Sequence, residues 1–305
     1  MHRPTHTPAR TRLLGDWGTS TLRLWWERDG VIAPWRIGPG IGAIDRSAAE
    51  VLQGFLADLE LAERPHSIAL CGMAGARGGL HEAGYADCPA DRAAWQHRAA
   101  RIDFDGIPLT IAAGVATPAG GNRADVMRGE ETQVFGAIAS DPALAAGRHT
   151  LLLPGTHSKW VTVEDGAITG FTTFMTGELF ALLGRSTLMS AGVAGEDEDA
   201  GFAAGLEHAP GGILGDLFQA RAMQLRHGRS GAWASGFVSG LLIGGEIGEA
   251  AARGLLPASV WLIGASALAK RYGLALVTCG TKTQILDAEK ITLAGLALMK
   301  SEIQP

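Results

Sequence analysis

The sequence has few cysteines, no long apolar segment and no excess of basic charge. Its three cysteines, Cys71, Cys88 and Cys279, lie far apart, and it contains no CxxC pair and no His/Cys cluster at zinc spacing. We therefore expect reduced thiols. No apolar run is long enough to cross a bilayer. A net charge of -5 provides no positive field for nonspecific nucleic-acid binding. These absences predict a cytoplasmic protein that binds neither membranes nor nucleic acids.

Apolar residues and glycine, by contrast, are plentiful. Hydrophobic residues make up 47% of the 305 residues, which is enough for two packed cores in domains of ordinary size. The 43 glycines are dispersed, which indicates many tight turns and close backbone approaches to a ligand. Residues 1–12 are basic and interrupted by proline, without the apolar region of a signal peptide, so we expect a loose tail.

An internal repeat is the most informative pattern in the sequence. Residues 17–32 and 154–168 each read as strand, Gly-Thr turn, strand, Asp-Gly hairpin and strand, and the two copies differ by one residue in length. Two copies, each opening an α/β unit, predict a duplicated fold whose Gly-Thr turns face each other across a cleft. We place the domains at 11–147 and 148–305, with the last helix, 287–300, packing back on the first domain.

The remaining elements are predicted from hydrophobic periodicity and from turn and capping signals. A capping box at Ser47 and Glu50 predicts a helix through Leu61. Residues 190–231 are expected to carry helices of an inserted subregion. The further strands are expected at 67–70, 108–113, 260–263 and 274–277, and the further helices at 129–138, from about 176, at 235–252, 265–272 and 287–299.

Both Gly-Thr turns can hold anions, because consecutive backbone N–H groups that point inward form a nest and small residues let a phosphate approach. The turns contain Gly18, Thr19, Ser20 and Thr21 in the first copy, and Gly155 and Thr156 in the second. Asp16 ends the first strand, where a carboxylate would position a phosphate-bound Mg²⁺, through water. The pair of turns with Asp16 therefore predicts phosphoryl transfer or hydrolysis.

Three motifs resemble those of the sugar kinase/actin/chaperone ATPase superfamily. DWGTSTLR (16–23) resembles its first phosphate motif, LLPGTHSKW (152–160) takes the place of the second without an acid before the glycine, and LIGAS (262–266) resembles the adenosine motif. The resemblance implies an α/β, two-domain actin-like ATPase (ribonuclease H-like) fold, with mixed sheets and duplicated βββαβα units around a central cleft. It also implies ATP and Mg²⁺, and it adds these nucleotide-binding candidates: Arg23, His157, Lys159, Gly264, Ala265 and Ser266.

Longer strings are similar to signatures of the 2-dehydro-3-deoxygalactonokinase family. They are MRGEETQ (127–133), LPGTHSKW (153–160), MTGEL (175–179) and SGLLIG (239–244), and the resemblance covers roughly residues 13–300. It implies ATP-dependent phosphorylation of the 6-hydroxyl of 2-dehydro-3-deoxy-D-galactonate, a sugar acid, as a catabolic step. A homodimer is compatible with this reading.

A kinase of this kind needs a carboxylate that orients and deprotonates the accepting hydroxyl. We favour Glu131, because Glu131, Val134, Phe135 and Ile138 follow the i, i+3, i+4, i+7 spacing of an inward-facing helical stripe. A partly buried carboxylate has a raised pKa and suits general-base work. Glu130 and Asp125 stay open as alternatives.

The carboxylate of a sugar acid requires a cation, and a guanidinium can bind it through two hydrogen bonds. Arg128 and Arg77 are the candidates. Glu178 is a candidate acceptor for substrate hydroxyls, while His157 and Lys159 flank Thr156 and could compensate phosphate charge.

The sequence leaves three other functions open. The protein could be an exopolyphosphatase-like phosphohydrolase, or a kinase of another sugar. It could also be a nucleotide-binding regulator or filament former without transfer activity, because the fold alone does not fix function.

Overall fold

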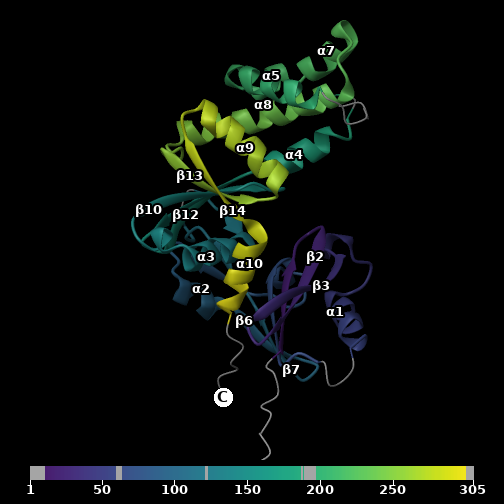
Figure 1. Cartoon of the computed structure of the whole chain (residues 1–305), viewed down its shortest axis with the longest axis vertical. Coiled ribbons are helices and arrows are strands. Elements are labelled where there is room, and N and C mark those ends of the chain that lie inside the picture. Colours follow the sequence, from purple (N-terminus) through teal and green to yellow (C-terminus); the bar gives the residue numbers. More distant parts are fainter. Residues whose placement is uncertain (1–10, 60–63, 121–122, 187, 189–196, 300–305) are drawn as a thin grey trace, which may run out of the picture. The chain divides into compact units, whose positions relative to one another are not determined.

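The computed structural model describes residues 11–59, 64–120, 123–186, 188 and 197–299. By its contacts the chain forms two compact units (Figure 1). The first unit comprises Met1–Gly147, Val163–Gly170 and Ala288–Pro305, and the second Arg148–Thr162 and Phe171–Asp287. Most of the expected tail lies outside the described residues, as do 190–196 of the expected subregion and residue 300 of the last helix.

A six-stranded mixed sheet forms the core of the first unit, in the order β3-β2-β1-β4-β7-β6. Strand β1 pairs antiparallel with β2 and parallel with β4. The hairpin predicted at Asp29 and Gly30 is confirmed, since both residues have positive φ, 51° and 80°. The strands are β1 (Thr11–Trp17), β2 (Thr21–Arg28), β3 (Val31–Pro39), β4 (Ser67–Gly72), β6 (Ala100–Phe104) and β7 (Ile107–Ile111).

The helices of the first unit include α1 (Ala48–Ala57), whose capping box between Ser47 and Glu50 is confirmed. It ends at Ala57, before the predicted Leu61. The other helices are α2 (Arg92–Arg98), α3 (Glu130–Ser140) and α10 (Ala288–Ala297), with 3₁₀ turns η1 (Ile41–Ala43), η3 (Met73–Gly75) and η4 (Pro142–Ala145). A three-stranded sheet, which the sequence did not predict, contains β5 (Tyr85–Asp87), β8 (Gly114–Ala116) and β9 (Val126–Met127).

Helix α10 packs on α3 although about 150 residues separate them in sequence. Gly136 and Gly295 make this approach possible, because a Cβ at either position would overlap the backbone of the other helix. Gln133 Nε2 also donates to Thr292 Oγ1 at 3.0 Å. The end of the chain is therefore part of the environment of α3.

The second unit is built on a five-stranded sheet in the order β12-β11-β10-β13-β14. Strands β10, β13 and β14 run parallel. The hairpin predicted at Asp165 and Gly166 is confirmed by φ values of 48° and 77°. The strands are β10 (Arg148–Leu153), β11 (Ser158–Glu164), β12 (Ala167–Phe174), β13 (Ser259–Gly264) and β14 (Lys282–Asp287).

One sequence prediction in this unit is wrong. Residues 274–277 are not a strand but the last turn of α9 (Ser266–Thr278), and the strand is β14 further on. The apolar run misled the prediction because Leu274 and Val277 are exposed, whereas Ala269, Tyr272 and Leu276 form the buried helical face. The remaining helices are α4 (Thr176–Leu183), α5 (Glu198–His208), α6 (Ile213–Asp216), α7 (Gln219–His227) and α8 (Gly231–Ala252), with the 3₁₀ turn η5 (Ala209–Gly211).

Helices α5 and α8 lie alongside each other at backbone contact (Figure 1). Gly201 and Gly205 of α5 face Gly236 and Gly240 of α8, and a Cβ at any of the four would overlap a backbone carbonyl of the facing helix. Helix α8 contains 22 residues. Even so, no helix within the described ranges has the length and apolar character that a membrane span requires.

We expect Gly236→Ala to lower the free energy of unfolding by about 1–3 kcal/mol, because the added methyl group forces α5 away from α8. Gly248→Ala in the same helix is the matched control. Its Cβ would meet no atom within 4 Å, so helix propensity should make this variant more stable by about 0.5–1 kcal/mol. Urea unfolding followed by circular dichroism measures both, and equal stability of the two variants would contradict the packing account.

Candidate functional site

The first Gly-Thr turn is fixed by a second loop of the chain. Ile41 N–H donates to Gly18 O at 3.0 Å and Gly42 N–H donates to Thr19 O at 2.8 Å. Gly40 packs so closely that a Cβ there would overlap the backbone of Thr19 and Ser20. The side chains of Thr19 and Ser20 remain exposed. Residues 40–42 thus fix the backbone of the turn on one side, while its exposed side is accessible to a ligand.

Asp16 lies at the end of β1, opposite Arg23 on β2. Burial raises the pKa of its carboxyl, and the Arg23 guanidinium, with Nη1 3.8 Å from Asp16 Oδ2, lowers it. The side chain is still about a quarter exposed. Mg²⁺ bound to phosphates needs only one or two carboxylates from a protein. Asp16 fits that role, and the described part of the chain holds no group of three or more metal-binding side chains.

Glu131 is the second residue of α3 and faces inward, as its helical spacing predicts. The start of α3 lies against the end of β4, because a Cβ at Gly129 would come within 3.2 Å of Gly72 Cα. Glu131 is fully buried; Gly129 N–H donates to its Oε2 at 2.7 Å, and Thr132 Oγ1 donates to its Oε1 at 3.1 Å. Burial, with a smaller contribution from Glu130, raises the pKa of Glu131 to about 8.

Cys71 shows that Asp16 and Glu131 share one place in the fold. Asp16 and Cys71 are partners in the parallel β1–β4 register, and the Cys71 thiol donates to Asp16 Oδ1 at 3.7 Å. Burial raises the pKa of Cys71 well above its usual value, and the negative charges of Asp16 and Glu131 raise it further. A buried thiol therefore lies within electrostatic reach of both carboxyl groups.

The other two acid candidates have different surroundings. Glu130 is half-buried and its Oε2 accepts a hydrogen bond from Arg128 N–H at 3.1 Å. Asp125 precedes β9 and its carboxylate accepts from Val126 N–H at 2.8 Å, while its own N–H donates to Thr117 Oγ1. Among the three acids, only Glu131 is fully buried.

The guanidinium of Arg128 is only partly satisfied. Nη2 donates to Ala83 O at 2.9 Å, and the group lies 4.3 Å from the centre of the Tyr85 ring. Nε and Nη1 are buried, and neither has a hydrogen-bond partner among the residues the structure describes. Two unpaired buried donors of one planar group are suited to a carboxylate. Arg77, the other candidate, is exposed.

The second Gly-Thr turn is joined to the start of α4. Glu178 N–H donates to Thr156 O at 2.9 Å, and a Cβ at Gly177 would overlap Gly155 O. His157 Nε2 and Glu178 Oε2 are 2.7 Å apart. These contacts bring two predicted site residues, His157 and Glu178, together beside the turn.

Lys159 and the adenosine motif are placed by the strands of this unit. Lys159 is buried, and its ammonium donates to Thr173 Oγ1 at 2.8 Å. Strands β10 and β13 are parallel, so the turn after β10 and the motif Gly264–Ser266 after β13 lie at the same edge of the sheet. The two segments are close: a Cβ at Gly264 would lie 3.2 Å from the carbonyl oxygen of Pro154.

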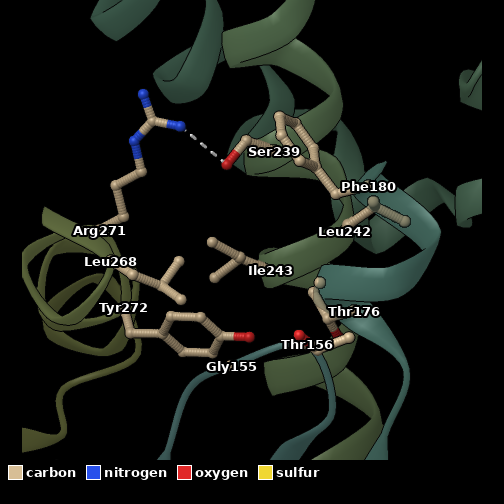
Figure 2. Close-up of a pocket in the computed structure, with 11 residues that line it drawn as sticks. Gly155, Thr156, Thr176, Phe180, Ser239, Leu242, Ile243, Leu268, Arg271 and Tyr272 are labelled. Atoms are coloured by element: carbon tan, nitrogen blue, oxygen red, sulfur yellow. Dashed lines mark hydrogen bonds between the residues drawn. The ribbon is translucent and has the colours of Figure 1, made fainter. Parts of the chain in front are cut away.

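A cavity of about 300 Å³ adjoins this edge (Figure 2). Thr156, Thr176 and the Tyr272 hydroxyl lie at one end, and Arg271 and Ser239 lie at the other. Apolar side chains form the wall between: Phe180, Leu242, Ile243 and Leu268. An apolar slot with polar groups at its ends, beside a phosphate-type turn, has the size and character of a nucleoside pocket.

Arg271, Ser239 and the cavity wall are not predicted from the sequence. Arg271 Nη1 donates to Ser239 Oγ at 3.1 Å and Nη2 to Glu198 Oε1 at 2.5 Å. The one available signal was SGLLIG (239–244), which was read as a family signature and not as a binding wall. Its role becomes visible only when α8 and α9 are packed together.

The chain is similar to known kinases over nearly its whole length. The family described as 2-keto-3-deoxy-galactonokinase matches residues 16–299. A protein of Rhizobium meliloti (strain 1021), named "Probable 2-dehydro-3-deoxygalactonokinase DgoK1", is 40% identical over 300 residues, which cover 95% of this chain and 96% of that protein. A crystal structure of a Sinorhizobium meliloti protein assigned to 2-dehydro-3-deoxygalactonokinase superposes with a TM-score of 0.82 at 38% identity, covering 94% of this chain and 95% of that one.

A more distant structure shows the fold alone. Component A of (R)-2-hydroxyglutaryl-CoA dehydratase from Acidaminococcus fermentans superposes with a TM-score of 0.53 at 16% identity, covering 95% of this chain and 97% of that one. The predicted class, an α/β actin-like ATPase fold with mixed sheets, is confirmed.

The burial of Glu131 predicts a specific pH dependence of stability. The pKa of Glu131 is about 8 in the folded protein against 4.5 as its reference value. Between these values the unfolded chain releases the proton and the folded chain keeps it. Rising pH therefore lowers the free energy of unfolding, by on the order of 1 kcal/mol per pH unit. Glu131→Gln lacks this term, so it should gain stability relative to the parent protein from pH 5 to pH 8 in urea unfolding. Parallel pH dependences would show that Glu131 is ionised in the folded state.

Proposed function

The chain belongs to the 2-keto-3-deoxy-galactonokinase family, and we propose that it transfers the γ-phosphoryl group of ATP to the 6-hydroxyl of 2-dehydro-3-deoxy-D-galactonate. It is a kinase that acts on a sugar acid and uses ATP. The observation that carries the proposed chemistry is the fully buried Glu131, which has a raised pKa. Its carboxyl group lies near Asp16, at the ends of β1 and β4.

In this proposal Glu131 is the general base. Its ionised carboxylate takes the proton of the sugar hydroxyl while the hydroxyl oxygen forms a bond to the γ-phosphorus, and the bond from phosphorus to the β–γ bridging oxygen of ATP breaks. A pKa near neutrality favours both proton uptake and later release to solvent. The N–H of Gly129 and the hydroxyl of Thr132 fix the direction in which the carboxyl group points.

Asp16 is the residue that would hold Mg²⁺, through water or directly. When bound, Mg²⁺ neutralises charge that develops on the transferred phosphoryl group. The open face of the Gly18–Thr21 turn would bind phosphate oxygens through backbone N–H groups. Burial raises the pKa of Asp16, and Arg23, across from it, offsets part of that rise.

The nucleoside is assigned to the second unit. The Gly155–Thr156 turn, the Gly264–Ser266 motif and the cavity meet at one sheet edge, so a phosphate chain at the turn and a nucleoside in the slot are neighbours. Apolar walls suit the faces of a base, and Arg271 supplies donors at the far end.

Arg128 is assigned to the carboxylate of the sugar acid. Its Nε and Nη1 are the two buried donors without a partner in the described chain, and Ala83 O and Tyr85 hold the guanidinium in place. A carboxylate would give these unpaired donors a charged acceptor. Glu178, beside His157, is assigned to accept hydrogen bonds from substrate hydroxyls.

The function is tested by measuring ADP release with a panel of acceptors. ATP with 2-dehydro-3-deoxy-D-galactonate should give one ADP per phosphorylated sugar acid, with the new ester at the 6-position by ³¹P and ¹³C NMR. Release of phosphate without an acceptor would favour the phosphohydrolase reading. A preference for another sugar would overturn the substrate, and no turnover with any acceptor would favour a regulator.

Glu131→Gln should lower kcat roughly 100- to 10,000-fold, because the amide cannot accept the proton. The dissociation constant of ATP, measured by calorimetry, should change little. Glu130→Gln is the matched control at the neighbouring position and should keep most of the turnover. Near-normal turnover of the Glu131 variant, or a loss confined to the Glu130 variant, would remove Glu131 as the base.

Arg128→Lys keeps the positive charge but loses the planar guanidinium and its several N–H donors. It should raise KM for the sugar acid on the order of tenfold or more, with little change in KM for ATP. Arg77→Lys, at the exposed alternative, should leave both values near those of the parent. If the Arg77 variant alone raises KM for the sugar acid, the carboxylate belongs to Arg77.

A further inference from the structure

A buried carboxylate that the proposed chemistry does not use lies in the second unit. Glu246, on α8, is 3% exposed. Ser158 Oγ and Trp160 Nε1 donate to its Oε1 at 2.7 and 2.8 Å, and Tyr272 Oη donates to its Oε2 at 2.5 Å together with Thr176 Oγ1. One side chain thus accepts four hydrogen bonds from β11, α4 and α9.

Hydrogen bonds, and not a counter-cation among the described residues, surround this carboxyl group. Burial raises the pKa of Glu246, and the four donors offset part of that rise. The indole N–H of Trp160 can only donate, so Oε1 must act as an acceptor. None of the ion pairs found among the described residues involves Glu246. A carboxylate with all four bonds made is held in one orientation, and so are the elements that donate to it.

The partners of Glu246 connect it to the nucleotide site. Thr176 starts α4, and the next two residues of that helix contact the second turn, through Gly177 against Gly155 O and Glu178 N–H to Thr156 O. Thr176 and Tyr272 also line one end of the cavity, next to Thr156 (Figure 2). Glu246 therefore links the second turn, one end of the cavity and α9.

We infer that Glu246 is a positioning residue for the nucleotide: it holds the Gly155–Thr156 turn in register with the cavity by tying Ser158, Trp160, Thr176 and Tyr272 together. This inference rests on the proposed function only in taking the ligand of the turn and cavity to be a nucleotide. Glu246 acts through its hydrogen-bond partners and needs no contact with ATP itself.

Glutamine at position 246 would keep the shape of the side chain and break its hydrogen-bond pattern. Its oxygen must remain at Trp160, which can only donate. Its NH₂ group would then face the hydroxyls of Thr176 and Tyr272, and both would have to turn their own hydrogens elsewhere. Ser158 and Trp160 on one side, and Thr176 and Tyr272 on the other, would no longer donate to one carboxyl group.

The test measures nucleotide binding directly, by calorimetry of Glu246→Gln with ATP and with ADP in the absence of sugar acid. We expect the dissociation constants to rise about tenfold, and KM for ATP to rise with them, while KM for the sugar acid changes less than about twofold. Glu249→Gln, one turn away on α8 and paired with surface Arg253, is the matched control and should bind ATP like the parent. Urea unfolding of each variant is measured alongside.

A purely structural role would give another result: a lower fraction of active protein and a lower free energy of unfolding, with unchanged affinity for ATP in the folded fraction. That result would overturn the inference. Because binding is measured without the acceptor, the outcome does not depend on which sugar acid is phosphorylated.

Ser158→Ala keeps the inference testable if the Glu246 variant does not fold. It removes one donor outside the cavity and should weaken ATP binding about threefold. The double variant should bind no more weakly than Glu246→Gln alone, since the hydroxyl acts through the carboxylate. Unchanged affinity in Ser158→Ala, or multiplied losses in the double variant, would contradict the assignment.

Discussion

The close approach of Gly129 to Gly72 determines where Glu131 lies in the first unit. A Cβ at Gly129 would come within 3.2 Å of Gly72 Cα, and a Cβ at Gly72 would overlap the carbonyl oxygen of Trp17 at the end of β1. Both residues also have positive φ, which glycine adopts without strain. Because the helix starts here, Glu131 is buried next to Cys71 and Asp16. The proposed base and the proposed metal-binding carboxylate thus come from segments more than 100 residues apart, through one backbone approach.

In the second unit, parallel strand pairing and a buried acid likewise bring distant segments of the chain to one place. The pairing of β10 with β13 brings the Gly155–Thr156 turn and the Gly264–Ser266 motif to one edge. Glu246 then joins the elements around that edge, so four donors are satisfied by one group. Both units use a buried carboxyl group, but the surroundings differ: Glu131 accepts few hydrogen bonds and has a pKa near 8, whereas Glu246 is fully hydrogen-bonded.

Local signals predicted the parts of this fold that depend on local physics. The two Asp-Gly hairpins and the capping box of α1 follow from backbone preference and a three-residue spacing, and all three are present. The sheet of β5, β8 and β9 was missed because its strands have two or three residues and join distant segments. The inward direction of Glu131 was readable from helical spacing. Arg271 and Glu246 were not, because their roles arise only where α8 packs against other elements.

The central claim is that the proton of the sugar hydroxyl goes to Glu131. The pH dependence of kcat/KM for the sugar acid, measured from pH 6 to 9.5, tests it most directly. The raised pKa predicts a rate that increases through an apparent pKa near 8 in the parent protein. The residual rate of the Glu131→Gln variant should lack this increase. The same rising limb in that variant would assign the proton to another group and contradict the account.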